Sequence, residues 1–403
     1  MPGALPLLDA ATLSGMTERG WTENAVTVTQ ALFSTALSPM TVEALTCDAL
    51  DFPVPLVQLR ENLYVMELFK GPTLAFKDVG ARFLSRLLAL FRRETDPSLT
   101  ILTATSGDTG GAVAHAFHGI PGLRVVVLFP DGKVTPRQER QFSTLGGNVM
   151  AVAVQGDFDD CQRLAKEAFQ KEARSGQGTL TSANSINIGR FLPQTTYFFE
   201  ACARLRSRDE TRTDILFSVP SGNFGNLAAG LLAKRMGLQS VSFLAATNMN
   251  DVVPEYLRTG RFAPRSSTPT LSTAMDVGNP SNLDRILHLY EGNVKALRED
   301  LVGRRVTDDD TQACINRVFS DTGYVLDPHS AVGFVALEAE LEERPEVTGV
   351  LLATAHPAKF AEVVEPIIGQ ALPIPPELSR GLEGEREVIL LEPHLDALWE
   401  AIR

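Results

Sequence analysis

Short apolar runs alternate with polar, glycine-rich turns and with amphipathic helices along most of this chain. The runs with the length and composition of buried strands are Thr100–Ala104, Val125–Phe129, Asp214–Val219, Val241–Ala245 and Val347–Leu352. Helices are predicted soon after three of them, at Ala112–Phe117, at Leu227–Met236 and from Pro357 through Val364. Strands that alternate with helices predict a mostly parallel sheet with helices on both faces. Ligands of such sheets bind beyond the carboxyl ends of the strands, where the glycine-rich turns fall.

The remaining segments carry weaker patterns. Residues 1–50 alternate short apolar stretches with Thr, Ser and Asp, which predicts small helices rather than a separate domain. Pro264–Pro280 is rich in Ser, Thr, Pro and Gly, and predicts a long surface loop. Pro373–Arg380 is a proline-rich tail, and Leu390–Ile402 can form a last short helix. We find no internal repeat.

Length and charge narrow the class of protein. The chain has 403 residues, enough for two domains, and its 44% hydrophobic and 21% charged residues are ordinary for a globular protein. A formal net charge of -12 opposes binding to nucleic acid or to anionic membranes. No apolar run is long enough to span a bilayer, and no secretory signal precedes one. We therefore expect a cytoplasmic protein with neither nucleic acid nor membrane as a partner.

Cysteine and histidine usage does not predict a metal site. Four cysteines lie far apart without a C-x-x-C pair, which favours reduced and mostly buried thiols. His115 and His118 have a spacing that can place two ligands on one helix face. A tetrahedral site needs three or four ligands, and no third one accompanies them at a suitable spacing.

The segment around Lys77 is the first candidate for chemistry. Gly71-Pro72-Thr73 is a turn, and the apolar residues from Phe76 onward recur every three or four positions, which predicts a helix with Lys77 in its first turn. The helix dipole favours anions at this end, so a lysine gains nothing there. Lys77 is then either an ordinary exposed lysine or an amine kept near neutrality by burial and by the dipole, ready to form an imine.

Two glycine-rich turns each follow a strand and open a helix. They are Ser106–Gly111, with the sequence SGDTGG, and Ser221–Asn226, with the sequence SGNFGN. Glycine lets a backbone approach a ligand, and free amides at a helix start attract an anion such as a phosphate monoester. The alternative is a tight turn, with Asp108 capping the helix in the first case. Two such turns and a candidate imine lysine together favour pyridoxal phosphate (PLP), which needs both an amine and a phosphate cup.

Seven blocks taken in order resemble the threonine synthase family of PLP enzymes. They are ELFKGPTLAFKD, TATSGDTGGAVAHAF, LFPDGKVTPRQERQF, TLGGNV, SANSINIGR, VPSGNFGNLAAGLLAK and TAHPAKF. The resemblance runs from about Leu56 to Phe360. The resemblance implies the tryptophan-synthase-β-like fold type: an α/β protein with two open, mostly parallel sheets flanked by helices, and an active site in the interdomain cleft.

The resemblance also implies a division into domains. We expect an amino-terminal helical segment at 1–50, a larger PLP-binding domain formed by 51–95 and 191–372, a smaller mobile domain at 96–190, and a tail at 373–403. The family begins with a further segment before the stretch that Met1–Pro6 resembles, so we expect this chain to lack that opening segment.

Site residues follow from the matched blocks. Lys77 is the expected Schiff-base lysine and the only expected catalytic residue. The expected cofactor ligands are Asp108 near the ring oxygen, Thr354 at the pyridine nitrogen, and the phosphate loop of Gly222, Asn223, Phe224, Gly225 and Asn226. The expected ligands of the substrate phosphate are Ser106, Thr109, Asn184, Ser185, Arg190 and Lys133, with Lys359 as a further candidate.

The family converts O-phospho-L-homoserine and water into L-threonine and phosphate, in threonine biosynthesis. The resemblance thus predicts a PLP-dependent carbon–oxygen lyase whose lysine moves protons at Cα and Cβ of the substrate. Two alternatives stay open: a phospho-lyase or dehydratase of the same fold that releases a 2-oxo acid, and a non-catalytic homologue that binds amino acids. A nucleotide-binding α/β domain is less favoured, because the chain has neither a P-loop nor a dinucleotide motif. The sequence does not indicate the oligomeric state.

Overall fold

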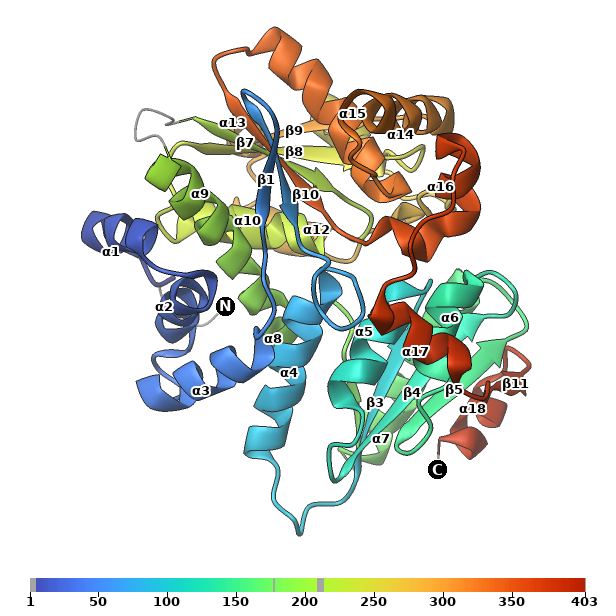
Figure 1. Cartoon of the computed structure of the whole chain (residues 1–403). Helices are drawn as coiled ribbons and strands as arrows, with labels where there is room; N and C mark the ends of the chain where they lie inside the picture. Colours follow the sequence, from blue (N-terminus) through green and yellow to red (C-terminus); the bar gives the residue numbers. More distant parts are fainter. Residues whose placement is uncertain (1–4, 177, 209–213, 403) are drawn as a thin grey trace. The chain divides into compact units, whose positions relative to one another are not determined.

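The chain folds into two units in the computed structural model, which describes residues 5–176, 178–208 and 214–402 (Figure 1). Unit 1 consists of Met1–Lys70, Phe191–Pro357 and Ala361–Leu372. Unit 2 consists of Gly71–Arg190, Ala358–Phe360 and Pro373–Arg403. Residues 1–4, the start of the segment compared with the family's opening, lie outside the described residues.

Unit 1 is built on a six-stranded sheet. Its strands, in spatial order, are β1 (Leu56–Arg60), β2 (Leu63–Glu67), β10 (Thr348–Ala353), β7 (Ile215–Pro220), β8 (Val241–Thr247) and β9 (Leu301–Arg305). Only the β1–β2 hairpin is antiparallel, and the other neighbours are parallel. The inner strands β7 and β10 are mostly apolar and fully buried because both faces of the sheet are covered, as parallel sheets require.

Successive residues of β7 show which helices cover which face. Phe217 packs against Phe198 of α9 (Thr196–Arg208), whereas the hydroxyl of Ser218 donates to the carbonyl of Gly333 in α15 (Pro328–Glu343). Because neighbouring residues of a strand point to opposite faces, α9 and α15 lie on opposite sides of the sheet. The other helices of unit 1 are α1 (Ala10–Gly15), α2 (Trp21–Phe33), α3 (Pro39–Ala49), α10 (Gly225–Arg235), α11 (Val252–Thr259), α12 (Leu283–Leu289), α13 (Val294–Asp300), α14 (Asp308–Thr322) and α16 (Ala361–Ile368), with 3-10 turns at Met16–Glu18, Leu192–Thr195 and Thr273–Met275.

Unit 2 is built on a five-stranded parallel sheet. Its strands, in spatial order, are β11 (Ile389–Leu391), β5 (Val149–Val154), β4 (Leu123–Pro130), β3 (Leu99–Ala104) and β6 (Leu180–Ser182). Its helices are α4 (Lys77–Phe91), α5 (Asp108–Phe117), α6 (Pro136–Ser143), α7 (Phe158–Ser175), α17 (Pro376–Glu383) and α18 (Leu395–Ala401), while α8 (Ile188–Phe191) runs across the boundary of the units.

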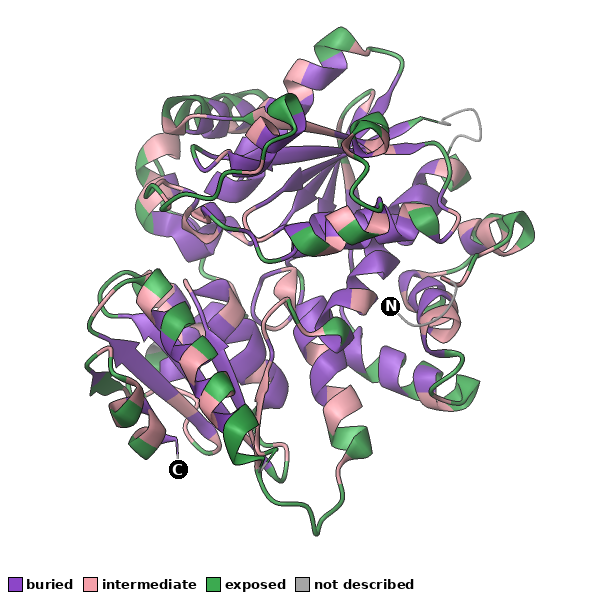
Figure 2. Cartoon of the chain, turned by 180° about the vertical axis from the view of Figure 1, so that it is seen from behind, coloured by how far each residue is buried: buried purple, intermediate pink, exposed green. Residues whose placement is uncertain are grey.

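Alternate residues of β4 belong to two separate cores of unit 2. Val125 and Val127 join a core with residues of α4 and α5, and Val126 joins a core with residues of α7 and α18. The central strands β4 and β7 are almost wholly buried, whereas α7 alternates buried and exposed positions (Figure 2). The predicted fold class, two mostly parallel sheets flanked by helices, is confirmed.

The structure differs from the predicted organisation in four places, one of which is that Ala358–Phe360, expected in the larger domain, group with unit 2. Residues 71–95, expected in the larger domain, group with unit 2, because Ala81 and Leu84 of α4 belong to the core around α5. The tail at 373–403 also belongs to unit 2, and it supplies strand β11 besides the expected last helix. The predicted loop Pro264–Pro280 is only partly at the surface, because buried Asn248 donates to Asp276 (2.9 Å) within a polar network.

Three of the four cysteines are buried, which raises the pKa of each thiol, and Cys47 is exposed. The described part of the chain contains no helix long and apolar enough to cross a membrane. Within the same residues no group of three or more His, Cys, Asp or Glu side chains is arranged to hold a metal ion.

Candidate active site

Three loops meet at the carboxyl edge of the unit 2 sheet. Strand β3 lies between β4 and β6, so the turn after Ala104 has the loops at 131–135 and 183–187 on its two sides. The Asn184 side chain donates to the Ala104 carbonyl (3.0 Å) and fixes one of these loops against the turn. The edge predicted to bind a ligand therefore gathers polar side chains from three segments.

The central turn opens helix α5 without a side-chain cap. Thr105 Oγ1 accepts from the amides of Gly107 (2.9 Å) and Gly110 (2.8 Å), which shapes the turn. Gly107 has φ 134°, and a Cβ there would lie 2.6 Å from the Gln138 side chain, so only glycine fits. Ser106 and Thr109 are half-buried on this turn, and Asp108 is the first residue of the helix. The alternative role of Asp108 as a cap is wrong, because its carboxylate is engaged elsewhere.

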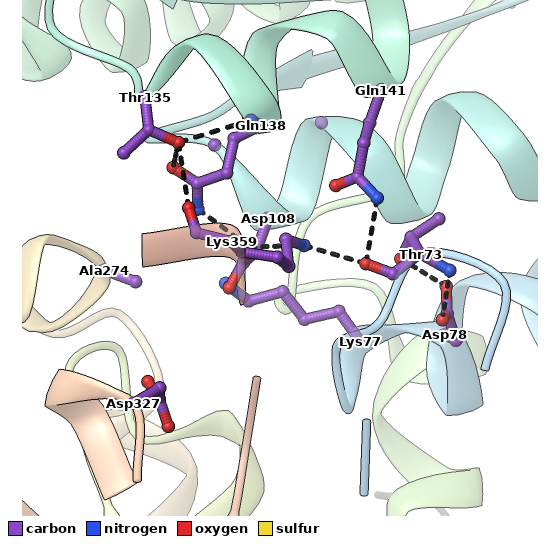
Figure 3. A network of polar contacts seen from close by, with 12 residues as sticks. Thr73, Lys77, Asp78, Asp108, Thr135, Gln138, Gln141, Ala274, Asp327 and Lys359 are labelled. Carbon is purple, nitrogen blue, oxygen red and sulfur yellow. Dashed lines mark hydrogen bonds and ion pairs between the residues drawn. The ribbon is translucent and has the colours of Figure 1, made fainter. Parts of the chain in front are cut away.

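Lys77 is the first residue of α4, as predicted, and it is not exposed. Its side chain is 14% exposed, and Nζ lies 3.8 Å from Asp108 Oδ2 (Figure 3). Burial lowers the pKa of Lys77 from 10.5 to about 8; Asp108 opposes this shift, while Arg190 and Lys359 add to it. An amine with this pKa has an appreciable neutral fraction near neutral pH, which is what a nucleophile or a proton acceptor needs.

Asp108 is the centre of a hydrogen-bonded network (Figure 3). Its Oδ1 accepts from Lys359 Nζ (2.7 Å) and from Gln138 Nε2 (2.8 Å). Lys359 Nζ also donates to the carbonyl of Thr73 (2.8 Å), in the turn before α4. The hydroxyl of Thr135, which caps α6, lies within reach of Gln138 Oε1 (3.0 Å). Because the network is buried and connected, Asp108 is held as a carboxylate in one position.

A second buried carboxylate shapes the turn before Lys77. Asp78 accepts from the Thr73 amide (2.8 Å) and hydroxyl (2.6 Å), and burial raises its pKa to about 6. Arg190 is 4% exposed and donates to the Ala183 carbonyl, next to Asn184. Burial lowers the pKa of Arg190 to about 10, although the charge of Asp78 opposes this shift. The buried guanidinium thus lies beside the polar loop at 183–187.

The second glycine-rich turn follows β7 in unit 1. Phe224 takes a left-handed conformation (φ 61°) immediately before α10, and this helix also begins without a side-chain cap. Asn223 Oδ1 accepts from the amide (2.6 Å) and the hydroxyl (3.0 Å) of Ser281, and Asn226 Nδ2 donates to the Pro220 carbonyl (3.0 Å). The turn is held in place by these hydrogen bonds, and the first amides of the uncapped helix can bind a phosphate.

Thr354 lies at the same edge of the unit 1 sheet as this turn. It follows β10, the direct neighbour of β7, and Leu351 of β10 is paired with Ser218 of β7. Thr354 and Ser221, each three residues further along, therefore leave the sheet side by side. Thr354 is 6% exposed, so its uncharged hydroxyl lies in a dry environment next to the turn.

A histidine supports the same turn from behind. A Cβ on Gly222 would lie 2.7 Å from the Ala274 carbonyl, so the backbone at 274 fills the space next to this glycine. The Ala274 amide donates to His329 Nε2 (3.1 Å), and His329 Nδ1 lies 2.6 Å from Asp327 Oδ2. Since Nε2 accepts, the proton must be on Nδ1, and the ring is the neutral tautomer that Asp327 orients.

These residues fit PLP on chemical grounds. Unit 2 offers a buried amine of lowered pKa, and unit 1 offers an uncapped helix start for a phosphate with a neutral hydroxyl beside it. No cationic residue is needed at a phosphate cup of this kind, because the backbone amides and the helix dipole hold the charge.

The predicted site residues fall into separate groups. Lys77 and Asp108 are brought together in unit 2; Ser106, Thr109, Asn184, Ser185 and Arg190 lie on the loops around them; and Gly222–Asn226 and Thr354 are neighbours in unit 1. Lys133 is exposed on the loop after β4. Lys359 is fully buried on Asp108, which is not the position expected for a phosphate ligand. The expected place of the active site in an interdomain cleft stays a prediction.

Sequence reasoning missed the supporting residues. Gln138 and Thr135 lie in Thr-Pro-Arg-Gln, a pattern typical of a helix start, which predicts α6 but not a contact with Asp108. Asp327-Pro328 is a similar helix start, and it gives no sign that Asp327 orients His329. Contacts across 30 residues or more carry no local pattern.

Comparisons with known proteins give matches over the whole length of the chain. A family model described as pyridoxal-phosphate dependent enzyme matches residues 49–354, and one described as threonine synthase, C-terminal, matches residues 330–402. The threonine synthase of Haemophilus influenzae is 46% identical over 403 residues, covering 100% of this chain and 91% of that protein. The crystal structure of threonine synthase from Escherichia coli superposes with a TM-score of 0.93 at 42% identity, covering 100% and 92% of the two chains. A PLP-bound threonine synthase from Brucella melitensis gives 0.91 at 34% identity, covering 100% and 92%.

Proposed function

This chain belongs to the threonine synthase family of PLP-dependent lyases, and from that membership we propose that it converts O-phospho-L-homoserine and water into L-threonine and phosphate. The predicted family and cofactor are confirmed by the comparisons. The identity of the substrate is our proposal, and it rests on the family and on the polar loops of unit 2.

The residues proposed to hold the cofactor each have a separate role. Bound PLP supplies an electron sink that stabilises negative charge at the substrate carbons. Lys77 is the covalent anchor, and the amides of Gly222–Asn226 receive the cofactor's phosphate at the start of α10. The Thr354 hydroxyl would form a hydrogen bond with the pyridine nitrogen. Asp108 would lie near the ring oxygen. An uncharged hydroxyl such as that of Thr354 draws less electron density from the ring than a carboxylate partner would.

Lys77 moves protons in this proposal. Its amine would take a proton from Cα of the substrate and then from Cβ, and return one later. A proton acceptor works best when its pKa is close to the working pH, and a pKa of about 8 meets that condition. The network around Asp108 holds the Asp108 carboxylate beside Lys77 Nζ. The two groups do not form a close ion pair, since Oδ2 and Nζ are 3.8 Å apart.

The substrate's phosphate would bind to the loops at the carboxyl edge of the unit 2 sheet. Ser106 and Thr109 offer hydroxyls at the uncapped start of α5, and Asn184 and Ser185 lie on the neighbouring loop. Arg190 adds a buried positive charge next to that loop. A phosphate held here is fixed for departure from Cγ, and a substrate without one forfeits these contacts. Lys133, exposed in the loop after β4, is a peripheral candidate.

The observation that carries the proposal is the buried Lys77 amine of lowered pKa beside Asp108, in a chain of this family. Purified protein supplied with O-phospho-L-homoserine should release phosphate and L-threonine in equal amounts, and Lys77→Ala should release neither. Release of 2-oxobutyrate in place of threonine would instead favour a phospho-lyase. Absence of any turnover in a wild-type protein that binds PLP would favour a non-catalytic homologue.

A further inference from the structure

Two lysines of unit 2 lie at different distances from the Asp108 carboxylate. Lys359 Nζ lies 2.7 Å from Asp108 Oδ1, whereas Lys77 Nζ lies 3.8 Å from Oδ2 (Figure 3). Charge-assisted hydrogen bonds between nitrogen and a carboxylate have separations of about 2.7–2.9 Å, so only Lys359 forms a close ion pair with Asp108. Lys77 has the longer contact, although it is the residue expected to react.

Contacts of both the side chain and the backbone hold Lys359 in this position. Its side chain is fully buried, and Nζ also donates to the Thr73 carbonyl (2.8 Å). The backbone around it is bound to the helix that carries Gln138: Arg137 Nη1 donates to the Ala358 carbonyl (2.7 Å), and the Thr135 hydroxyl lies 3.3 Å from the Lys359 carbonyl. An ammonium group enclosed in this way cannot leave Asp108 without becoming an unpaired buried charge, which is strongly unfavourable.

We propose that Lys359 is the permanent counter-ion of Asp108 and thereby makes it easier for the amine of Lys77 to lose its proton and react with the aldehyde of the cofactor. Lys359 is then a positioning residue rather than a ligand of the substrate's phosphate. The proposal rests on the attachment of PLP to Lys77, as given above.

The reason is the balance of charge around Lys77. Burial disfavours its charged form most, Asp108 favours that form, and the positive groups Arg190 and Lys359 disfavour it. Without Lys359, the carboxylate of Asp108 would have Lys77 as its nearest cation, and an opposite charge within about 4–6 Å raises the pKa of a lysine by about 1–3. Only the neutral amine reacts: its lone pair forms the C=N bond to the aldehyde carbon, and the aldehyde oxygen leaves as water with the two amine protons.

The test is the rate at which the full-length chain, freed of cofactor, takes up added PLP at different pH values. Uptake is followed by the absorbance of the bound cofactor, which does not depend on turnover. The wild type should react with a midpoint near pH 8, the pKa expected for Lys77. Lys359→Met should move the midpoint up by about one pH unit or more, which lowers the rate at pH 7 about tenfold. Lys359→Arg keeps a positive charge and should retain the wild-type midpoint, and so should Lys166→Met, which changes an exposed lysine of α7.

Three results would overturn the proposal: a wild-type midpoint near 10.5, an unchanged midpoint in Lys359→Met, or an equal upward shift in Lys359→Arg. Thermal melting shows whether each variant is folded. If Lys359→Met does not fold, Lys359→Gln serves in its place: it keeps a hydrogen-bond donor for Asp108 and the Thr73 carbonyl but removes the charge, so the midpoint must again rise above that of the wild type. A midpoint that stays or falls refutes the idea. A wild type that takes up no PLP at any pH would refute the proposed function itself, so the two failures can be told apart.

Discussion

Replacing Lys77 by methionine should abolish turnover and at the same time raise the free energy of unfolding of the cofactor-free chain at pH 7. The reason is the cost of keeping an ammonium group in a buried position. The lowering of the Lys77 pKa from 10.5 to about 8 corresponds to ~3 kcal/mol of destabilisation by the charged form, as an upper limit. Methionine has a similar length and no charge, so the variant avoids this cost.

The sign of the effect changes with pH in a defined way. Below pH 8 the amine is protonated in both the folded and the unfolded chain, and the folded chain bears the full cost. Between pH 8 and 10.5 the folded chain has released its proton while the unfolded chain still holds one, so the cost shrinks as the pH rises. Above 10.5 neither state is charged and the cost is absent. The advantage of Lys77→Met should therefore be largest below pH 8 and vanish above 10.5.

Differential scanning calorimetry of the cofactor-free wild type and variant, at pH 7 and at pH 10.5, measures this difference. Lys166→Met, at an exposed position of α7, is the matched control and should leave stability within about 0.5 kcal/mol at both pH values. The reasoning is refuted if Lys77→Met is no more stable than the wild type at pH 7, or if its gain is the same at both pH values.

Three further substitutions test other parts of the structure. Gly222→Ala would place a methyl group 2.7 Å from the Ala274 carbonyl, so the dissociation constant of PLP, measured by equilibrium dialysis, should rise about tenfold or more. Gly80→Ala would place one 2.3 Å from the Arg190 carbonyl and displace that residue, so steady-state kinetics should show a raised KM for O-phospho-L-homoserine. Leu398→Ala removes a fully buried side chain from the core around α7 and should cost ~2–5 kcal/mol in urea denaturation.

Each of these has a control in the same chain. Gly15→Ala, where the nearest atom would lie 3.8 Å away and φ is -63°, should leave both PLP affinity and KM unchanged. Arg386→Ala removes the ion pair between Arg386, in the tail, and Glu139 of α6. It should lower the free energy of unfolding by only ~0–1 kcal/mol, in contrast to Leu398→Ala. Equal effects of a control and its partner would contradict the contact assigned to that partner.

The sequence predicts those parts of the fold that have a local cause. The β-branched runs, the turns after them and the start of α4 at Lys77 can all be read from neighbouring residues, and the structure has strands β3, β4, β7, β8 and β10 where they are expected. The grouping of Ser221 with Thr354 depends on strand order, which the pattern of a single strand does not contain. The family resemblance contains that information, since it implies that the loop Gly222–Asn226 and Thr354 bind one cofactor.

The partners of Asp108 illustrate what local patterns cannot predict. Lys359 is 251 positions away along the chain, and an isolated lysine after a strand looks like any surface lysine. Its burial results from the path of residues 358–360, which leave the segments of unit 1 and join unit 2. Residues 71–95 are assigned to the wrong domain for a similar reason. The sequence predicts the apolar stripe of α4, but it does not predict which core that stripe joins.

The order in which the strands occur along the chain has a consequence for biosynthesis. The six-stranded sheet needs β10 (Thr348–Ala353) between β2 and β7, and the five-stranded sheet receives its outer strand, β11, from Ile389–Leu391. A protein whose units are consecutive can fold the first while the ribosome still makes the second. Here the emerging β2 and β7 must wait for a neighbour that lies more than a hundred residues downstream of β7. The edges of β2 and β7 therefore stay unpaired until residue 353 has left the ribosome, and the outer edge of β5 stays unpaired until residue 391 has done so.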